Sequence, residues 1–364
     1  MKILFVITSL GVGGAERMVT TLADKFVSEG HEVVLSYFHG PASLKPLDAR
    51  VSLVDLCMAR RPYAVIRSLW RLRRLIREFE PDVVNSHLVH ANVLTRLLRI
   101  VTPMRRLISS AHITNEGKPA RMLAYRVTDW LADISTNVSD EAVELFRQKG
   151  GTTLGRMITV FNGIDTTAFV FDPEVRERLR AELSIGENTS VLLAVGRLWN
   201  QKDYPNLLRA VALLSNMDFC PQLLIVGDGP LRAQLVDLAE SLGVAPQVRF
   251  LGVRHDVPEL MSICDVFVLS SSYEGFGLVV AEAMACERLV VATNCGGVKE
   301  VLGDCGFLVA PRDPESLAES MSNALKLSKR EACALGHDAR KRVIEKFSLA
   351  TTAENYLAVY RSAG

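Results

Sequence analysis

The sequence has no hydrophobic run long enough to cross a membrane, and this absence excludes an integral membrane protein. A spanning helix needs about 18 or more apolar residues in a row. The apolar stretch at residues 3–10 is much shorter and predicts a buried first strand. Because a single lysine precedes it and no small-residue cleavage site follows it, we do not expect a signal peptide. With 49% hydrophobic and 23% charged residues, the chain is neither disordered, collagen-like nor a coiled coil.

The sequence also lacks any CxxC pair among its seven cysteines. An odd number without paired spacing argues against a disulfide framework and gives no support for a structural zinc site. We therefore expect free, mostly buried thiols in a reducing compartment, and the cytoplasm is the expected location.

An excess of one charge sign is missing from the whole chain, whose net charge is +1, but not from its parts. Residues 1–170 hold 22 Lys+Arg against 16 Asp+Glu, and residues 58–126 hold 14 against 4. A basic first half joined to an acidic second half suggests that the two halves have different partners.

Short apolar runs alternate with amphipathic stretches along the whole chain, which predicts parallel sheets covered by helices on both faces. A length of 364 residues favours two domains, so the expected fold class is α/β with two doubly wound Rossmann-like domains. The predicted strands are 3–8, 32–37, 82–86, 106–111, 133–136, 157–160, 191–196, 222–226, 247–250, 265–269, 289–292 and 306–309.

Turn signals at 161–175 mark the expected domain boundary. We place an N-terminal domain at 1–168, completed by the C-terminal helix at 349–364, and a C-terminal domain at 169–348.

A glycine-rich turn with Gly11, Gly13 and Gly14 follows the first predicted strand and precedes a helix. Such a turn lets backbone amides approach an anion, although it also occurs as a purely structural turn. The third glycine of a dinucleotide-binding loop is absent, and the second strand does not end in an acidic residue. Nicotinamide binding is therefore disfavoured.

Arg197 directly follows a predicted strand, and Lys202 lies just before a helix in the second half. A strand-end arginine and a lysine beside a helix N-terminus would suit a pyrophosphate. Two solvated loop charges are the alternative. The carboxyl end of a parallel strand favours the binding interpretation, because ligands sit there in open α/β sheets.

Residues 265–285 contain a strand, a serine-rich loop and an apolar helix. Glu274 lies in the loop and Glu282 in the helix, and the two could serve acid/base chemistry or accept hydrogen bonds from sugar hydroxyls. The loop end could offer backbone amides to a phosphate through Gly275, Phe276, Gly277 and Leu278.

Residues 60–77 predict a basic amphipathic helix, with Arg67, Arg71 and Arg74 at helical spacing and Trp70 among its apolar positions. It could lie on an anionic bilayer or simply pack its apolar stripe on a sheet. A nucleic-acid partner is disfavoured, because aromatic interleaving and a known binding module are missing. Further arginines extend the expected cationic region: Arg96, Arg99, Arg105, Arg106, Arg121 and Arg126.

Taken in order, several motifs resemble the retaining glycosyltransferases of family 4, which share the two-domain GT-B fold. The resemblance covers nearly the whole chain. Its carriers are the loop Gly11–Gly14, His112, NGID at 162–165, GRL…K at 196–202, GDGP at 227–230 and the E-x7-E signature from Glu274 to Glu282. Asp203 departs from the pattern where many relatives have glycine.

The resemblance implies a role for each matching residue. Arg197 and Lys202 would hold the nucleotide-sugar diphosphate, Glu274 would contact the donor sugar, and Glu282 would bind the ribose. His112 would point at the donor sugar from the first domain, with the two domains facing across a cleft. The remaining donor-binding positions would be Gly13, Gly14, Gly196, Gly275, Phe276, Gly277 and Leu278.

The implied activity is transfer of a hexose or N-acetylhexosamine from a nucleotide sugar, with a UDP-sugar favoured over a GDP-sugar. No metal or cofactor is expected, because cationic side chains and helix N-termini can stabilise the leaving diphosphate. Retention by a front-face route is favoured over double displacement on Glu274. The expected acceptor is a lipid-diphosphate-linked glycan of bacterial surface polysaccharide synthesis, reached by an enzyme peripheral to the inner face of the cell membrane.

Three other functions compete with this one. A nucleotide-sugar 2-epimerase would share the fold and the diphosphate-binding residues. A sugar-binding receptor or a regulatory protein with an inactive site would leave the four residues Arg197, Lys202, Glu274 and Glu282 without a joint purpose.

Overall fold

The computed structural model describes residues 1–11, 13–59, 61–112, 119–215, 217 and 220–362. The chain divides into unit 1, Met1–Gly163 with Leu349–Gly364, and unit 2, Ile164–Ser348. Each unit is described by itself. A few residues of the expected motifs lie outside the described residues: Val12, Arg60, Ile113 and Thr114.

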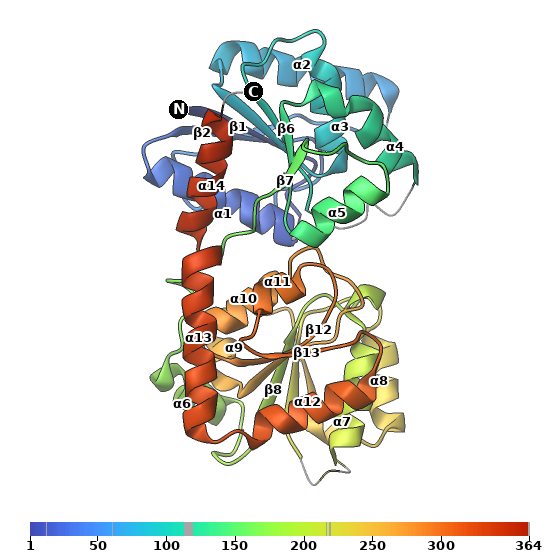
Figure 1. The fold of residues 1–364 in the computed structure, drawn as a ribbon, viewed down its shortest axis with the longest axis vertical. Coiled ribbons are helices and arrows are strands. Elements are labelled where there is room, and N and C mark those ends of the chain that lie inside the picture. The colour runs from blue at the N-terminus through green and yellow to red at the C-terminus, as the bar shows by residue number, and fades with distance from the viewer. Residues whose placement is uncertain (12, 60, 113–118, 216, 218–219, 363–364) are drawn as a thin grey trace. The chain divides into compact units, whose positions relative to one another are not determined.

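Unit 1 is built on a parallel sheet with the order β3-β2-β1-β4-β5-β6-β7 (Figure 1). Because the chain builds outwards from β1 in both directions, the loops after β1 and β4 leave the carboxyl edge of the sheet on opposite faces. The strands are β1 (Lys2–Ile7), β2 (Glu32–Tyr37), β3 (Ser52–Asp55), β4 (Val83–His87), β5 (Leu107–Ser110), β6 (Ile134–Asn137) and β7 (Met157–Thr159).

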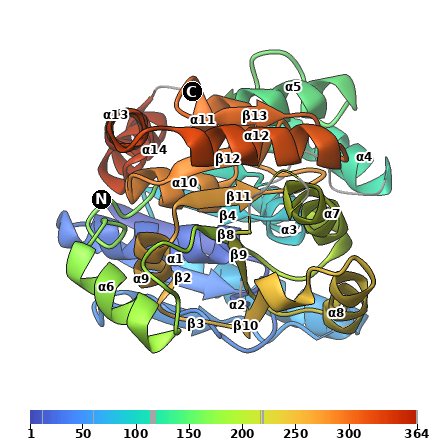
Figure 2. The same cartoon turned by 90° about the horizontal axis from the view of Figure 1, so that it is seen from below.

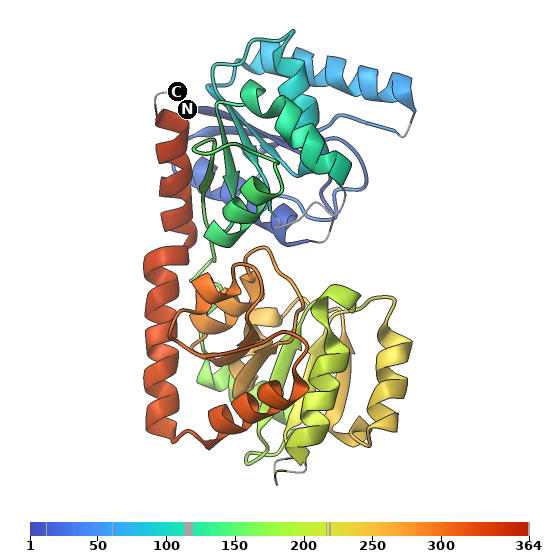
Figure 3. The ribbon, with the colours of Figure 1, turned by 45° about the vertical axis from the view of Figure 1, so that its right-hand side comes forward.

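Helices cover both faces of this sheet (Figure 3). One face packs against α1 and α14, where Phe26 and Tyr360 lie in the core. The other packs against α2 and α3 through residues such as Leu72, Ile76 and Leu98. The helices are α1 (Gly14–Ser28), α2 (Pro62–Phe79), α3 (Val89–Arg99), α4 (Pro119–Thr128), α5 (Asp140–Gln148) and α14 (Leu349–Arg361).

Unit 2 repeats the plan with the parallel order β10-β9-β8-β11-β12-β13. Its strands are β8 (Val191–Val195), β9 (Gln222–Val226), β10 (Val248–Gly252), β11 (Val266–Leu269), β12 (Leu289–Thr293) and β13 (Phe307–Val309). A core cluster joins the sheet to α7, α8 and α12. Figure 2 shows α12 beside α7 and α6 beside α9. The helices are α6 (Pro173–Glu182), α7 (Tyr204–Ser215), α8 (Arg232–Ser241), α9 (Val257–Ile263), α10 (Leu278–Ala285), α11 (Val298–Leu302), α12 (Pro314–Lys326) and α13 (Lys329–Phe347).

The expected fold class is confirmed: both units are doubly wound, Rossmann-like α/β domains. Each expected strand is present within two residues of its observed ends. The sequence analysis missed β3, an edge strand that pairs only with β2. Its residues Ser52–Asp55 are only half buried or exposed, so they show no continuous apolar run.

The seven cysteines are free, as expected. The expectation that most are buried is wrong, because Cys57, Cys220 and Cys333 are exposed. Only three lie in the core, namely Cys264, Cys286 and Cys295.

Arg96 is part of the core of unit 1, which corrects the expectation that it belongs to a cationic surface. Its side chain is fully buried, and its Nε and Nη2 donate to the hydroxyls of Ser109 and Ser135 at 3.0 and 2.7 Å. The guanidinium also donates to the Tyr125 carbonyl and lies 3.7 Å from an Asp129 oxygen. A buried charge requires this degree of pairing.

Two further arginines of the expected surface are also engaged within unit 1. Arg99 pairs with Asp133 at 2.9 Å, and Arg106 donates to the Val359 carbonyl of α14 at 3.0 Å. The positive charge of residues 58–126 is therefore divided between the surface and the interior.

Arg96→Met is expected to destabilise unit 1 by about 3 kcal/mol or more, because it leaves Asp129 buried without this cation. Arg126→Met is the matched control, since Arg126 is exposed, and it should change stability by less than about 0.5 kcal/mol. Urea unfolding of both variants measures the difference. Equal stabilities would contradict a structural role for Arg96.

Candidate functional site

The centre of the candidate site in unit 2 is an ion pair between Lys202 and Glu274. Lys202 Nζ lies 2.6 Å from Glu274 Oε1, and both side chains are mostly buried. Ser271 Oγ donates to the same carboxylate oxygen at 2.7 Å. The two residues are far apart in sequence but follow β8 and β11, which are neighbours in the sheet. The structure therefore brings these two motifs together at the carboxyl edge of the unit 2 sheet.

The two loops that carry this pair are hydrogen-bonded to each other. Ser270 Oγ donates to the Lys202 carbonyl at 2.8 Å, and the Ser272 backbone N–H donates to the Gln201 carbonyl at 2.8 Å. Gly296 packs against the loop that carries Glu274. Its φ is 56°, and a Cβ at this position would collide with the Glu274 carbonyl. A side chain at this glycine would displace the loop, so the carboxylate position depends on it.

Arg197 is exposed, on the same loop as Lys202. Its guanidinium stacks on the Trp199 ring, 4.8 Å from the centroid. Gly196, just before it, offers its carbonyl to the Tyr204 hydroxyl at 3.0 Å, and a Cβ there would press on the Lys202 side chain. The small residue at 196 thus permits the observed course of Lys202 toward Glu274.

The segment Gly275–Leu278 forms the start of α10. Gly277 is the N-cap, with a φ of 91° that favours glycine, and it presents no capping side chain. The Phe276 ring is buried and packs edge-on against Phe347 at 5.5 Å. This segment can therefore offer backbone groups to a ligand, whereas the Phe276 side chain belongs to the core.

Glu282 lies within α10 and is only 5% exposed. The helix is apolar around it, as the sequence predicted. A carboxylate buried at this position either stabilises the fold or binds a polar ligand near the start of the helix.

The candidate site in unit 1 holds two buried histidines in contact. His87 Nδ1 and His112 Nε2 are 2.9 Å apart, and the rings lie 5.2 Å apart by their centroids. His87 Nε2 and His112 Nδ1 have no hydrogen-bond partner in the described part of the chain. Burial lowers the pKa of His112 to about 4 and holds that of His87 well below its usual value. Both imidazoles are therefore neutral at pH 7, and one donates to the other.

The histidine pair lies at the carboxyl edge of the unit 1 sheet, where the strand order reverses between β1 and β4. His87 is the last residue of β4 and is the register partner of Ile7 at the end of β1. Leu88, which follows it, has a φ of 71°, a strained value for leucine that turns the chain into α3. On the β1 side, Gly13 is the N-cap of α1 and Gly14 its first residue, so no side chain caps this helix.

His87 is a residue that the sequence analysis missed. The feature that could have identified His87 is its position at the end of a buried strand, at the point where the strand order reverses. The contact with His112 could not be seen, since it requires β4 and β5 to be neighbours in register.

The three arginines expected on the outer face of α2 differ in their surroundings. Arg67 and Arg74 are exposed, and Arg74 pairs with Glu78 at 2.7 Å. Arg71 is half-buried and donates to the Leu56 carbonyl at 3.2 Å, so it is partly a structural residue.

The outer face of α2 also carries exposed apolar side chains. Tyr63, Ile66 and Trp70 are each about three-fifths exposed, at 61%, 58% and 62%. They recur at helical spacing beside Arg67 and Arg74, while the inner stripe packs on the sheet through Leu72 and Ile76. The outer face of the helix therefore combines exposed apolar side chains with arginines.

Two kinds of feature are absent from the described residues. No helix in them is both long and apolar enough to span a membrane. Within the same residues, no three His, Cys, Asp or Glu side chains gather as a set of metal ligands would.

Comparison with known families matches both units. Residues 12–168 match the family described as Glycosyltransferase Family 4, and residues 175–342 match the family described as Glycosyl transferases group 1.

Individual proteins resemble the chain over most of its length. The alpha-maltose-1-phosphate synthase of Mycolicibacterium smegmatis is 30% identical, over 77% of this chain and 78% of its own length. The lipopolysaccharide core biosynthesis glycosyltransferase LpsE of Rhizobium meliloti is 25% identical over 96% of each chain. The structure of Anabaena HepE in complex with UDP superposes with a TM-score of 0.85 at 24% identity, over the whole of both chains. The fold is thus that of the GT-B glycosyltransferases.

The neutral histidine pair predicts a loss of stability in acid. In the unfolded chain His112 titrates near 6.5, whereas its folded pKa is about 4. Between these values the unfolded state binds more protons, so the free energy of unfolding falls as pH decreases. From pH 7 to 5 the His112 contribution is on the order of 2 kcal/mol.

Urea unfolding of unit 1 at both pH values measures this loss. The His112→Gln variant should lose less stability than the unaltered chain, and the exposed His337→Gln variant should behave like the unaltered chain. Equal losses for His112→Gln and the unaltered chain would rule out a buried neutral His112.

Proposed function

This chain belongs to the family 4 glycosyltransferases, and we propose on that basis that it transfers a hexose or N-acetylhexosamine from a nucleotide sugar to a glycan. The observation that carries the proposal is the Lys202–Glu274 pair beside the exposed Arg197, at the carboxyl edge of unit 2. This edge is where open α/β sheets bind ligands. A UDP-sugar is the favoured donor, and the similar fold of HepE in complex with UDP supports that choice.

In this proposal the donor binds side chains of unit 2 that are paired with each other in the structure. The diphosphate is bound by Arg197 and by Lys202, which is paired with Glu274 in the structure described. Glu274 accepts hydrogen bonds from the sugar hydroxyls, and Glu282 from the ribose. The backbone amides at the start of α10 lie at the positive end of a helix, which favours a phosphate.

We propose that the anomeric configuration is retained by a front-face reaction. The bond from the anomeric carbon to the phosphate oxygen breaks with its electron pair leaving on the diphosphate. The acceptor hydroxyl oxygen bonds to the same face of that carbon, and its proton passes to a phosphate oxygen. Ser271 Oγ donates a hydrogen bond to Glu274 Oε1, which weakens this carboxylate as a nucleophile and disfavours double displacement. Charge on the leaving group is stabilised by cationic side chains, so no metal or cofactor is required.

For unit 1 we propose roles in sugar and acceptor binding. His112 contacts the sugar being transferred, and the amides at Gly13 and Gly14 bind phosphate oxygens. His87 is a positioning residue: its hydrogen bond to His112 Nε2 sets the tautomer and orientation of that ring.

We further propose a lipid-diphosphate-linked acceptor in bacterial surface polysaccharide synthesis, with unit 1 bound to the cytoplasmic face of the membrane. The name of the Rhizobium relative LpsE supports the pathway. The outer face of α2 supports the membrane contact, because exposed Tyr63, Ile66 and Trp70 alternate with arginines. Exposed aromatic and aliphatic side chains among cations suit the interface of an anionic bilayer.

Arg197→Ala is expected to weaken UDP binding about 10- to 100-fold, because a charged hydrogen bond to the diphosphate is worth about 1.5–3 kcal/mol. Calorimetric titration with UDP measures the change, and exposed Arg330→Ala is the matched control in the same unit. Mass spectrometry of a donor and acceptor screen then tests turnover, which should release nucleotide only with an acceptor and fall in Arg197→Ala.

Each outcome separates the candidate activities. A 2-epimerase would change the sugar without releasing UDP or forming a heavier glycan. Absence of UDP and GDP binding by the unaltered chain would overturn the transferase proposal.

Arg67→Glu and Trp70→Ala are each expected to reduce flotation with anionic vesicles. A basic residue near such a surface contributes about 1 kcal/mol, so charge reversal at Arg67 should cost tenfold or more. Arg330→Glu on unit 2 is the control for net charge. Binding that is the same on neutral and anionic vesicles, or the same in Arg67→Glu and Arg330→Glu, would exclude α2 as the membrane contact.

A further inference from the structure

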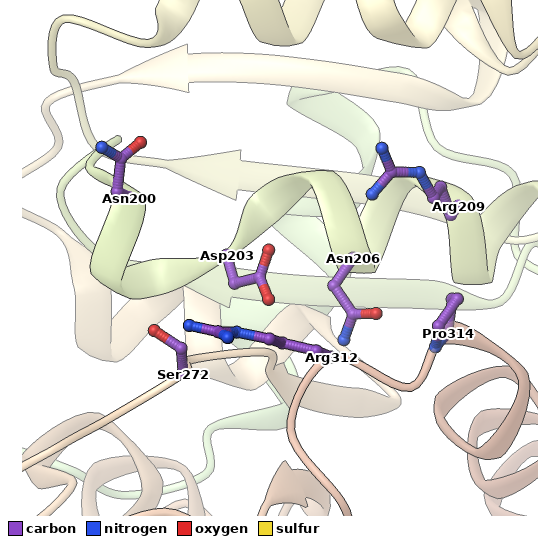
Figure 4. Close-up of a pocket in the computed structure, with 7 residues that line it drawn as sticks. All are labelled: Asn200, Asp203, Asn206, Arg209, Ser272, Arg312 and Pro314. Carbon is purple, nitrogen blue, oxygen red and sulfur yellow. The ribbon is translucent and has the colours of Figure 1, made fainter.

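A polar pocket lies in unit 2 between the first turns of α7 and α12 (Figure 4). Its volume is about 320 Å³, at the lower end of the range for small-molecule sites. Lys202 and Glu274 do not line it, so it is distinct from the ion pair of the candidate donor site. Its lining residues are Asn200, Asp203, Asn206, Arg209, Ser272, Arg312 and Pro314.

The strongest indication of a ligand is Asn206, on the first turn of α7. Asn206 is only 2% exposed, yet neither its Oδ1 nor its Nδ2 has a hydrogen-bond partner among the described residues. A buried amide without partners costs about 1–3 kcal/mol. Figure 4 shows its carboxamide directed toward Arg312, inside the pocket. Such a group is explained if a bound molecule supplies the missing donor and acceptor.

The pocket also holds two cations without counterions. Arg209 and Arg312 form no ion pair within the part of the chain that the structure describes. Arg312 has a φ of 62°, and its side chain extends toward Ser272, below Asp203 in Figure 4. The N-terminus of α7 adds positive potential, whereas that of α12 is already capped by the Asp313 carboxylate. These features favour an anion.

The remaining lining groups are neutral or acidic and favour hydroxyls. Asn200, Asn206 and Ser272 offer amide and hydroxyl groups, and Asp203 offers a carboxylate that can only accept hydrogen bonds. A carboxylate would repel a bare anion but bind the hydroxyls of a sugar. A ligand that carries both a phosphate and several hydroxyls satisfies the whole lining.

We propose that this pocket binds a phosphorylated sugar, with the phosphate on Arg312 and the hydroxyls on Asp203 and Asn206. The site is separate from the donor site but adjoins it in the chain, because Asp203 follows Lys202 and Ser272 follows Ser271. A ligand there contacts the same two loops that hold Lys202 and Glu274 together.

Calorimetric titration of the full chain with glucose 6-phosphate, inorganic phosphate and glucose tests the proposal. Glucose 6-phosphate should bind at least tenfold more tightly than either of the other two probes. Arg312→Ala should weaken its binding about tenfold or more, since one charged hydrogen bond is worth about 1.5–3 kcal/mol. Exposed Arg330→Ala is the control for the loss of a surface arginine.

Asn206→Leu provides a second variant that should fold at least as well as the unaltered chain. Removing an unpartnered buried amide costs no hydrogen bond, so the melting temperature should stay equal or rise while glucose 6-phosphate binding falls. A variant that retains its affinity for the sugar phosphate would contradict the assigned role of Asn206.

Arg197→Ala separates this pocket from the donor site. Arg197→Ala should bind glucose 6-phosphate with unchanged affinity although its affinity for UDP falls. Arg312→Ala should keep its affinity for UDP although its affinity for glucose 6-phosphate falls. No binding of glucose 6-phosphate at millimolar concentration, equal affinity for inorganic phosphate, or unchanged binding in Arg312→Ala would each overturn the proposal. Failure of UDP binding alone would count against the transferase function and leave this pocket standing.

Discussion

The carboxyl ends of parallel strands meet at one edge of a sheet, and in each unit this constraint brings together groups that are distant in sequence. In unit 2, β8 and β11 are neighbours, so the loops after them meet and Lys202 reaches Glu274. In unit 1, β4 and β5 are neighbours, so His87 at the end of one strand reaches His112 just after the other. The two candidate sites follow from the same rule of topology.

Both pairs avoid an uncompensated buried charge, but by different means. Lys202 and Glu274 neutralise each other's charge, with Ser271 as a further donor to the carboxylate. A diphosphate and a sugar could replace these partners with groups of matching sign. The histidines instead remain uncharged, because burial disfavours the protonated form of either ring. The ring nitrogens outside this hydrogen bond, His87 Nε2 and His112 Nδ1, provide one donor and one acceptor for an uncharged ligand.

The basic character of unit 1 has two origins. Arg96, Arg99 and Arg106 bind carboxylates, hydroxyls or carbonyls within the unit and contribute to its stability. Arg67 and Arg74 lie on the outer face of α2, beside exposed aromatic and aliphatic residues. A count of charges along the chain combines both groups. Only the second group can attract an anionic surface.

The sequence alone determined the fold class, the strands with strong apolar runs and the loops that carry Arg197, Lys202 and Glu274. These features depend on local periodicity and on turn residues, which a single stretch of chain displays. It did not reveal the edge strand β3, the buried Arg96, the partner His87 or the pocket around Asn206. Each of these depends on contacts between residues that are distant in sequence. Whether an arginine is surface or core, and whether an asparagine is satisfied, is decided by which neighbours the packed sheet and helices bring to it, and only the tertiary structure specifies those neighbours.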